Sequence, residues 1–331
     1  MTLRWEVMRD GVEEAWDAVV QTSPTATFFQ RRAWAEVIER TFPRWRPAPV
    51  ALEFSDGNVG VLPLMRHAPI GHRESMPPHV YGGPVFLRPP GALHLEAAQS
   101  VATWYPDVTL VDNPFCGYRR EQDGLARWQL TTTATDLRAG FDTLWGRFRD
   151  SHRRHVRSAE RQGVTSGLAE SLADVDAYYA IYRDSLRRWG AGARGFYPRA
   201  LFRNLFRSSE FGRGIRLLLA RKDGAVIGGI VVLHHGTQTT YWHGASHAAH
   251  ASAHPSPFLL VSALREACAA GQHWFDFGSQ DRHMQGVQHF KDGFASQRLV
   301  YDAWYSSNSV RGLLFTRYRT LRERRFHRCP L

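Results

Sequence analysis

The sequence predicts an α/β or α+β protein, because segments with helical periodicity alternate with short strand-like segments along most of its length. The chain has 331 residues, which is long for one compact domain and comfortable for two. Hydrophobic residues make up 43% of it and charged residues 22%, an ordinary globular composition that can supply one or two cores. We expect two domains, over residues 1–140 and 141–331.

In the first domain, the pattern predicts one helix and three strands. Apolar residues at helical spacing indicate a helix over 27–42. The apolar runs 50–54 and 59–65 flank Asp56-Gly57, and therefore predict two strands joined by a tight turn. A third, short strand is expected over 108–111.

In the second domain, helical and strand patterns alternate more clearly. Helices are predicted over 141–161, 172–189, 198–206 and 257–270, and strands over 215–220, 226–234, 239–244, 274–277 and 299–305. The segment between the last two strands is expected to be a loop. A basic amphipathic helix is expected over 310–328.

The charge balance favours an anionic partner. The net charge is +11, which suits nucleic acid, a phosphorylated carrier or anionic lipid. Only Lys222 and Lys291 are lysine, so a GC-rich genome explains the preference for arginine but not the excess of base over acid. No apolar stretch of about 18 residues and no signal-peptide core occur, so we expect a cytoplasmic protein. The three cysteines lie far apart and form no metal-binding pair or disulfide framework.

Three segments of the second domain carry ordered motifs. They read SHRRHVRSAERQGV over 151–164, YWHGAS over 241–246, and FDFG over 275–278 followed by GV at 286–287, FK at 290–291 and GF at 293–294. Two weaker matches lie upstream, FFQ at 28–30 with Trp34 and VGVLPL at 59–64. In this order the segments resemble the Fem-type peptidyltransferases, which transfer amino acids from aminoacyl-tRNA to amines of cell-wall precursors or small molecules.

This resemblance implies two tandem acetyltransferase-like (GNAT-like) domains and an amide-forming N-acyltransferase. The order of helices and strands predicted for the second domain matches such a fold. The donor it implies is aminoacyl-tRNA, and the acceptor is an amine of a small molecule or a peptidyl precursor. No metal or redox cofactor is implied. Residues that it assigns to substrate binding are Trp34, Tyr241, Trp242, His243, Ser246 and Phe290.

Lys291 is the strongest catalytic candidate. Acyl transfer to an amine passes through a tetrahedral oxyanion, which a fixed cation stabilises. The same lysine could instead hold a phosphate of the donor. Asp276 lies between two phenylalanines of a predicted strand, so its side chain points to the opposite face. There it could position the attacking amine, or simply cap the turn before Gly278.

Arginines supply two candidate phosphate-binding surfaces. Arg153, Arg154 and Arg157 lie on overlapping faces of the predicted helix over 141–161, and guanidinium groups bind phosphate oxygens in pairs. The predicted helix over 310–328 interleaves arginines with aromatic residues, as RNA-binding helices do. We assign Arg317, Arg322, Arg324 and Arg325 to tRNA binding. The predicted helix over 310–328 would also suit peripheral contact with an anionic membrane surface, and both surfaces could instead be solvated basic faces.

Two further patterns argue for no cofactor. The histidines at 243, 247, 250 and 254 have no cysteine or acidic cluster beside them, so we expect no metal site. The match Arg187-Arg188-Trp189-Gly190-Ala191-Gly192 fits the pyrophosphate loop of acetyl-CoA enzymes, but a helix rather than a strand precedes it. Donation from acyl-CoA or an acyl carrier is the first alternative, and a non-catalytic RNA- or lipid-binding protein is the second.

Overall fold

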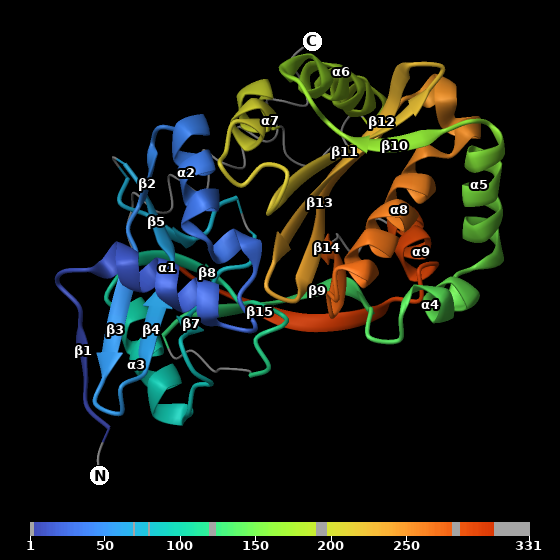
Figure 1. Ribbon diagram of the computed structural model, residues 1–331. Helices are drawn as coiled ribbons and strands as arrows, with labels where there is room; N and C mark the ends of the chain where they lie inside the picture. The colour runs from blue at the N-terminus through green and yellow to red at the C-terminus, as the bar shows by residue number, and fades with distance from the viewer. Residues whose placement is uncertain are drawn as a thin grey trace. The chain divides into compact units, whose positions relative to one another are not determined.

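The computed structural model describes residues 3–68, 70–78, 80–118, 124–189, 197–279 and 285–307. These residues form two compact units (Figure 1). The first contains the described residues up to Leu130 together with 300–307, and the second contains residues 131–299. A domain boundary near residue 140 stays a prediction, since compactness alone does not show which segments fold independently.

The first unit is built on two groups of paired strands. One is antiparallel and has the order β1 (Trp5–Val7), β3 (Val50–Phe54), β4 (Val59–Leu62) and β7 (Val85–Phe86). The other has the order β15 (Gln297–Ser307), β8 (Asp107–Val111), β6 (Arg73–Ser75), β5 (Leu64–His67) and β2 (Trp45–Pro47). The last described strand of the chain therefore completes the sheet of the first unit.

The helices of this unit are α1 (Val12–Thr22), α2 (Arg32–Thr41), α3 (Ala92–Ala102) and the short 3-10 helix η1 (Phe28–Gln30). The helix predicted over 27–42 is confirmed as η1 followed by α2. The predicted strand pair is also confirmed, with Val50 opposite Leu62. Pro63 separates β4 from β5, because proline has no N–H to donate to the ladder.

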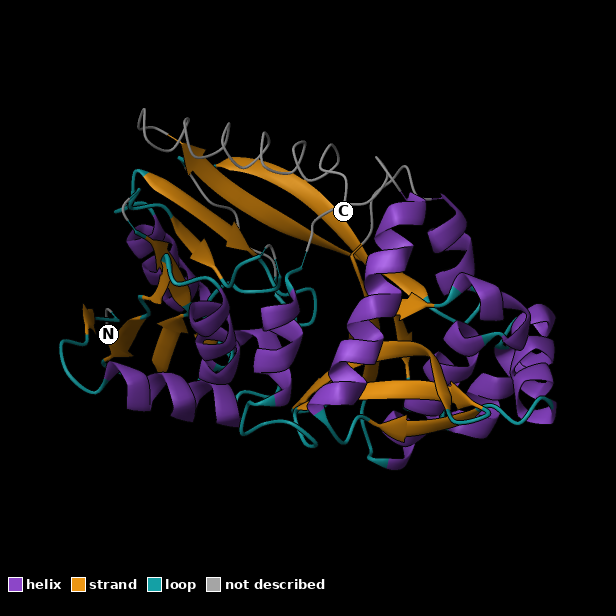
Figure 2. Ribbon diagram, turned by 90° about the horizontal axis from the view of Figure 1, so that it is seen from above, coloured by secondary structure: helices purple, strands orange, loops and turns teal. Residues whose placement is uncertain are grey.

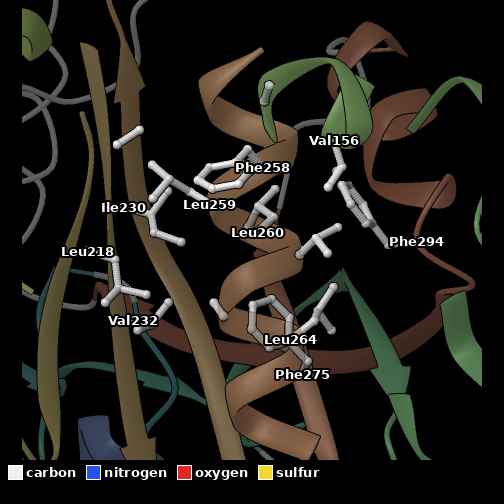
Figure 3. Close-up of a cluster of buried hydrophobic side chains, with 14 of the residues drawn as sticks. Val156, Leu218, Ile230, Val232, Phe258, Leu259, Leu260, Leu264, Phe275 and Phe294 are labelled. Carbon is white, nitrogen blue, oxygen red and sulfur yellow. The ribbon is translucent and has the colours of Figure 1, made fainter. Parts of the chain in front are cut away.

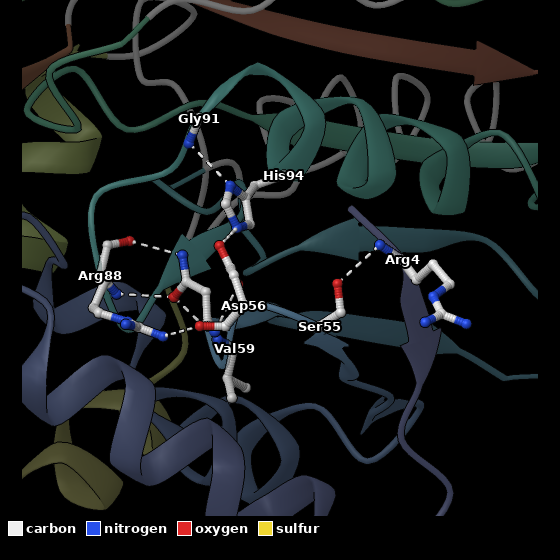
Figure 4. A network of polar contacts seen from close by, with 8 residues as sticks. Arg4, Ser55, Asp56, Val59, Arg88, Gly91 and His94 are labelled. Carbon is white, nitrogen blue, oxygen red and sulfur yellow. Dashed lines mark hydrogen bonds and ion pairs between the residues drawn. The ribbon is translucent and has the colours of Figure 1, made fainter. Parts of the chain in front are cut away.

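The turn between β3 and β4 is held by a polar network (Figure 4). Gly57 has φ +77°, a conformation that glycine adopts without steric cost. The Asp56 carboxylate accepts hydrogen bonds from the Asn58 N–H at 2.9 Å and from Nε2 of His94 at 3.0 Å. These two bonds lower the pKa of Asp56, and the Asn58 bond contributes most. The network connects the hairpin to α3, which carries His94.

The second unit has one main sheet. Its order is β10 (Thr165–Leu168), β11 (Ile215–Lys222), β12 (Ala225–His235), β13 (Gln238–Ser246), β14 (Trp274–Ser279) and the end of β9 (Ala126–Asp136). Neighbouring strands are antiparallel except β13 and β14. That parallel pair is joined through η3 (Ala248–Ala253) and the crossover helix α8 (Pro255–Ala269).

Helices cover both faces of this sheet (Figures 1 and 2). Alternate residues of β11 and β12 point to opposite faces, as the pleat requires. Leu218 and Ile230 belong to the core beneath α8, together with Val156 and Phe294 (Figure 3). Leu219 and Gly229 lie on the other face, against Tyr178 of α6 (Leu172–Trp189). Beside α6 lies α7 (Arg199–Phe206).

One predicted helix of this unit is wrong in its extent. The segment 141–161 is two helices, α4 (Phe141–Arg147) and α5 (Asp150–Arg161), because Phe148 and Arg149 have extended ψ angles of 146° and 139°. Phe148 is buried against Phe294, so tertiary packing breaks the helix where no proline or glycine does. The predicted loop before β15 is also wrong in part, since α9 (Gln285–Asp292) lies within it.

Candidate functional site

The parallel strands β13 and β14 separate partway along their length. Their pairs run from Gln238↔Trp274 to Thr240↔Asp276, and within the described residues the ladder ends there. Beyond this point β13 stays paired with β12, whereas β14, which pairs with β9 from Trp274 onwards, shifts its register on β9 between Asp276 and Ser279. Gly278 has φ +72°, and a side chain there would meet the Tyr241 carbonyl oxygen at 3.5 Å.

A β-bulge lies on β13 just after the strands separate. Tyr241 pairs with Val232 and His243 pairs with Val231, so Trp242 is the extra residue. Bulges bend a strand and re-aim its side chains. The motif YWHGAS thus begins where β13 leaves β14, and the bulge turns its side chains away from a regular alternation.

Asp276 lies at the point of separation and is fully buried. Its Oδ1 accepts hydrogen bonds from Thr132 Oγ1 at 2.6 Å and from the Gly278 N–H at 3.0 Å. Phe275 and Phe277 belong to the core on the opposite face, which confirms the expected alternation along β14. Asp276 therefore caps the turn at Gly278, as one reading of the sequence proposed, and it also lies next to Lys291.

Lys291 extends from α9 to the same turn. Its side chain is only 5% exposed, and Nζ donates a hydrogen bond to the Gly278 carbonyl at 2.9 Å. Burial lowers the pKa of Lys291 to about 8, although the nearby Asp276 carboxylate opposes the shift. At neutral pH the group is therefore a largely desolvated cation, and such a cation interacts strongly with a developing negative charge.

His243 sits among aromatic rings from α6 and α7. Its ring centroid lies 4.5 Å from that of Tyr182 and 5.0 Å from that of Phe202. Nδ1 forms a 2.5 Å hydrogen bond with the hydroxyl of buried Tyr178. Burial lowers the pKa of His243 to about 3, so the imidazole is neutral at neutral pH. Trp242 lies beside the same rings, 5.0 Å from Tyr197.

The other predicted binding residues of this unit contact neighbouring residues of the fold. Tyr241 packs against the core cluster beneath α8, and burial raises its pKa to about 12. The Ser246 carbonyl accepts a hydrogen bond from Arg188 at 3.0 Å. Phe290 packs on Phe294 with ring centroids 5.2 Å apart. Their assignment to substrate binding stays a prediction.

In the first unit, Trp34 is fully buried, and its Nε1 donates to the Pro77 carbonyl at 3.0 Å. Its indole also packs edge-to-face on Phe29 with centroids 5.0 Å apart. These contacts give Trp34 a packing role, and substrate binding by this residue stays a prediction.

The arginines of α5 divide into two kinds. Arg154 and Arg157 are exposed, and the guanidinium of Arg157 lies over the Trp145 ring at 6.0 Å. Arg153 instead pairs with Asp150 and donates to the Gly146 carbonyl at 2.8 Å, where it closes the α4–α5 junction. An exposed basic stripe therefore exists, and binding of phosphate to it stays a prediction.

The histidine run lies on β13, η3 and the start of α8. His254 stacks on His155 of α5 with ring centroids 4.1 Å apart. No group of three or more metal-ligating side chains occurs within the described residues. The CoA-loop match begins in the last turn of α6, and its glycines lie outside the described residues.

Arg317, Arg322, Arg324 and Arg325, with the predicted helix that carries them, also lie outside the described residues. Among the helices that the structure describes, none is both long and apolar enough to span a membrane.

Sequence reasoning missed several neighbours of the candidate residues. These are Thr132, Tyr178, Tyr182, Phe202 and Arg149. Thr132 lies 144 positions before Asp276, and Tyr178 lies 65 positions before His243. No local pattern joins residues so far apart in sequence, so only the fold reveals these contacts.

Comparisons with known proteins agree with this architecture. Residues 146–292 match the family model described as an acetyltransferase (GNAT) domain. The crystal structure of FemX is similar with a TM-score of 0.66 at 15% identity, over 94% of this chain and 99% of that one. No curated protein sequence matches the chain.

Two further solved structures share the fold. The C-terminal domain of a putative lysylphosphatidylglycerol synthetase from Agrobacterium fabrum has a TM-score of 0.54 at 15% identity, over 94% of this chain and 96% of that one. A tandem GNAT protein from the clavulanic acid biosynthesis pathway has a TM-score of 0.52 at 13% identity, over 93% and 99%. The predicted fold class is thereby confirmed. The chain therefore has a GNAT-like fold: residues 146–292 match the GNAT domain model, and the whole architecture is similar to that of FemX.

Proposed function

We propose that this protein is an N-acyltransferase that moves an aminoacyl group from aminoacyl-tRNA to an amine. The observation that carries the proposal is the buried Lys291 ammonium, held on the Gly278 carbonyl where β13 and β14 separate. The Fem-type motifs, the fold shared with FemX and the net charge of +11 support the choice of donor. The acceptor is an amine of a small molecule or a peptidyl precursor.

The chemistry needs one proton transfer and no redox step. The neutral acceptor amine attacks the ester carbonyl of the donor, and the carbonyl oxygen becomes an oxyanion. Lys291 uses one of its three N–H groups on Gly278, and we assign a second to the oxyanion. The attack itself forms the C–N bond, and collapse of the intermediate restores the C=O bond and breaks the ester C–O bond. The amine proton leaves with the released ribose hydroxyl.

Asp276 has a supporting role in this proposal. Its carboxylate stabilises the ammonium form of Lys291 and fixes the turn that supplies the Gly278 carbonyl. The exposed arginines of α5 are proposed to bind donor phosphates.

The test is amide formation from defined donors. Purified protein is incubated with a mixture of radiolabelled aminoacyl-tRNAs and a panel of amines, with and without prior ribonuclease treatment. Ribonuclease-sensitive transfer supports the proposal. Ribonuclease-resistant transfer from acyl-CoA would instead identify acyl-CoA as the donor. The GNAT domain match favours this alternative. Absence of transfer from either donor, with retained tRNA binding, would favour a non-catalytic RNA-binding protein.

A further inference from the structure

The short helix α9 ends beside α5, and the segment that begins α5 contacts its last turn. The last carbonyls of a helix lack partners within the helix and need them from elsewhere. Arg149 Nη1 donates to the His289 carbonyl at 2.9 Å, and His152 Nε2 donates to the Phe290 carbonyl at 2.9 Å. The Arg149 N–H also donates to the Gly293 carbonyl at 2.9 Å. Three bonds thus fasten the end of α9 to residues 149–152.

His152 is fitted closely into this contact. It is 5% exposed, and its ring lies between Phe290 at 5.1 Å and Phe294 at 4.4 Å, measured between centroids. A Cβ at Gly293 would lie 2.5 Å from His152 Nε2, so only glycine leaves room for the ring. Because a carbonyl only accepts, Nε2 must carry the hydrogen. Burial lowers the pKa of His152, and the nearby Arg149, His155 and His289 lower it further, although the hydrogen bond to the Phe290 carbonyl opposes the shift.

Lys291 is the residue between Phe290 and Asp292 in that last turn. Its Nζ reaches the Gly278 carbonyl only while the last turn stays in place. A small displacement of α9 would lengthen this 2.9 Å bond and admit water to a group that is 5% exposed. Loss of about one ångström in placement can cost roughly a hundredfold in rate.

We propose that His152 and Arg149 are positioning residues for Lys291, holding the last turn of α9 so that the ammonium stays desolvated at the Gly278 carbonyl. The inference rests on the proposed function only for its effect on catalysis. Its structural part, the control of the Lys291 environment, stands independently of which donor the enzyme uses.

The two lysines make a direct test possible. In the full chain labelled with lysine carrying ¹³C at Cε, NMR gives two lysine signals, and Lys222→Arg assigns them. We expect the Lys291 signal to titrate near pH 8 in the wild type. In His152→Met, which keeps volume but loses the donor, the midpoint should rise by about one pH unit towards the ordinary lysine value. His152→Gln, whose amide can donate to the same carbonyl, should restore the wild-type midpoint.

His155→Met is the matched control. It lies one turn further along α5, stacks on His254, and has no contact with α9 among the described contacts. It should leave the Lys291 midpoint unchanged. Arg149→Met should act in the same direction as His152→Met, and circular dichroism should show each variant folded.

Kinetics separate this inference from the proposed function. We expect kcat to fall about tenfold in His152→Met with KM unchanged, and its pH profile to move with the Lys291 midpoint. An unchanged Lys291 midpoint in folded His152→Met and Arg149→Met would overturn the positioning role. A shifted midpoint with full turnover in Lys291→Met would keep the positioning role and overturn the catalytic role of Lys291.

Discussion

Lys291 and Lys222 differ in their surroundings more than in their sequence contexts. Lys222 is partly exposed at a hairpin, where Nζ donates to Gln162 at 3.3 Å. Lys291 is buried beside a carboxylate, with one main-chain acceptor for its ammonium. Because desolvation strengthens electrostatic interactions, only the second lysine is placed to stabilise an oxyanion strongly.

Replacement of Lys291 by methionine should therefore lower kcat by roughly 10²–10³-fold, since one oxyanion donor is worth about 2.7–4 kcal/mol. Methionine has a similar length and carries no charge. Steady-state amide formation checks the effect, with Lys222→Met as the control. Turnover of Lys291→Met within a factor of two of the wild type would exclude Lys291 from the mechanism.

The same lysine predicts how stability changes with pH. Its folded-state pKa of about 8 lies below the unfolded value of 10.5, so the unfolded chain binds more protons between these values. Stability contributed at this site should therefore rise as pH increases from 8 to 10.5, by at most about 3 kcal/mol. Urea unfolding of wild type and Lys291→Met across pH 7–10 measures the difference. A difference that stays constant or falls with pH would show that Lys291 is not desolvated.

Lys291 and Asp276 could be selected from the sequence because both lie in ordered motifs. Their environment could not be predicted, because Thr132 and Gly278 reach them through β9 and a turn of β14. His243 was singled out for its motif alone. The rings around it come from α6 and α7, and nothing in the local sequence indicates that its pKa falls.

At the scale of elements, the packing of α6 on β12 depends on a missing side chain. A Cβ at Gly229 would lie 2.6 Å from Tyr178 Cδ2 and 2.9 Å from Leu219 Cδ2. Tyr178 is fully buried and its hydroxyl is hydrogen-bonded to His243, so its side chain has little freedom to move. Close approach of helix and strand thus requires glycine at this position.

Gly229→Ala should destabilise the protein by about 1–3 kcal/mol, as overpacking of a filled core does. Gly167→Ala provides the control, because Gly167 lies on β10 of the same sheet and a Cβ there would meet nothing within 4 Å. Chemical denaturation of both variants and the wild type gives the comparison. Equal stability of the two alanine variants would mean that α6 does not pack on β12 as described.

The elements with strong periodicity, such as α6 and α8, were predictable because their apolar faces repeat over several turns. The break between α4 and α5 was not, since Phe148 continues the apolar pattern while its burial against Phe294 bends the backbone. Helix α9 was missed because eight residues give too few turns for a periodic signal.

For the whole molecule, the net charge of +11 predicts salt-sensitive binding to RNA. Replacing Arg317, Arg322, Arg324 and Arg325 by glutamine should weaken tRNA binding. It should also reduce the magnitude of the slope of log K against log salt by roughly 3, because fewer phosphate contacts form and fewer counterions are released on binding. Titrations at several salt concentrations measure the slope. An unchanged slope would place the tRNA contacts elsewhere on the chain.

The sequence does not show which of the two units each strand belongs to. A strand near 299–305 was expected, but as part of the second domain. Pairing of Ala303 with Val111 and burial of Trp304 instead assign the end of β15 to the first unit. Apolar alternation reveals a strand and not its partner, so long-range pairing of this kind needs the fold.

The return of β15 sets an order for biosynthesis. Residues 131–299 form a contiguous unit that contains all of its own described strands by the time residue 299 has left the ribosome. The first unit, although translated earlier, lacks the strand that pairs with β8 and the Trp304 indole that donates to Asp112 at 2.8 Å. The amino-terminal part of the nascent chain therefore has one strand edge of its sheet open until β15 has been made. An open edge can pair with strands of other chains, so the first-made half is most prone to aggregation during that interval.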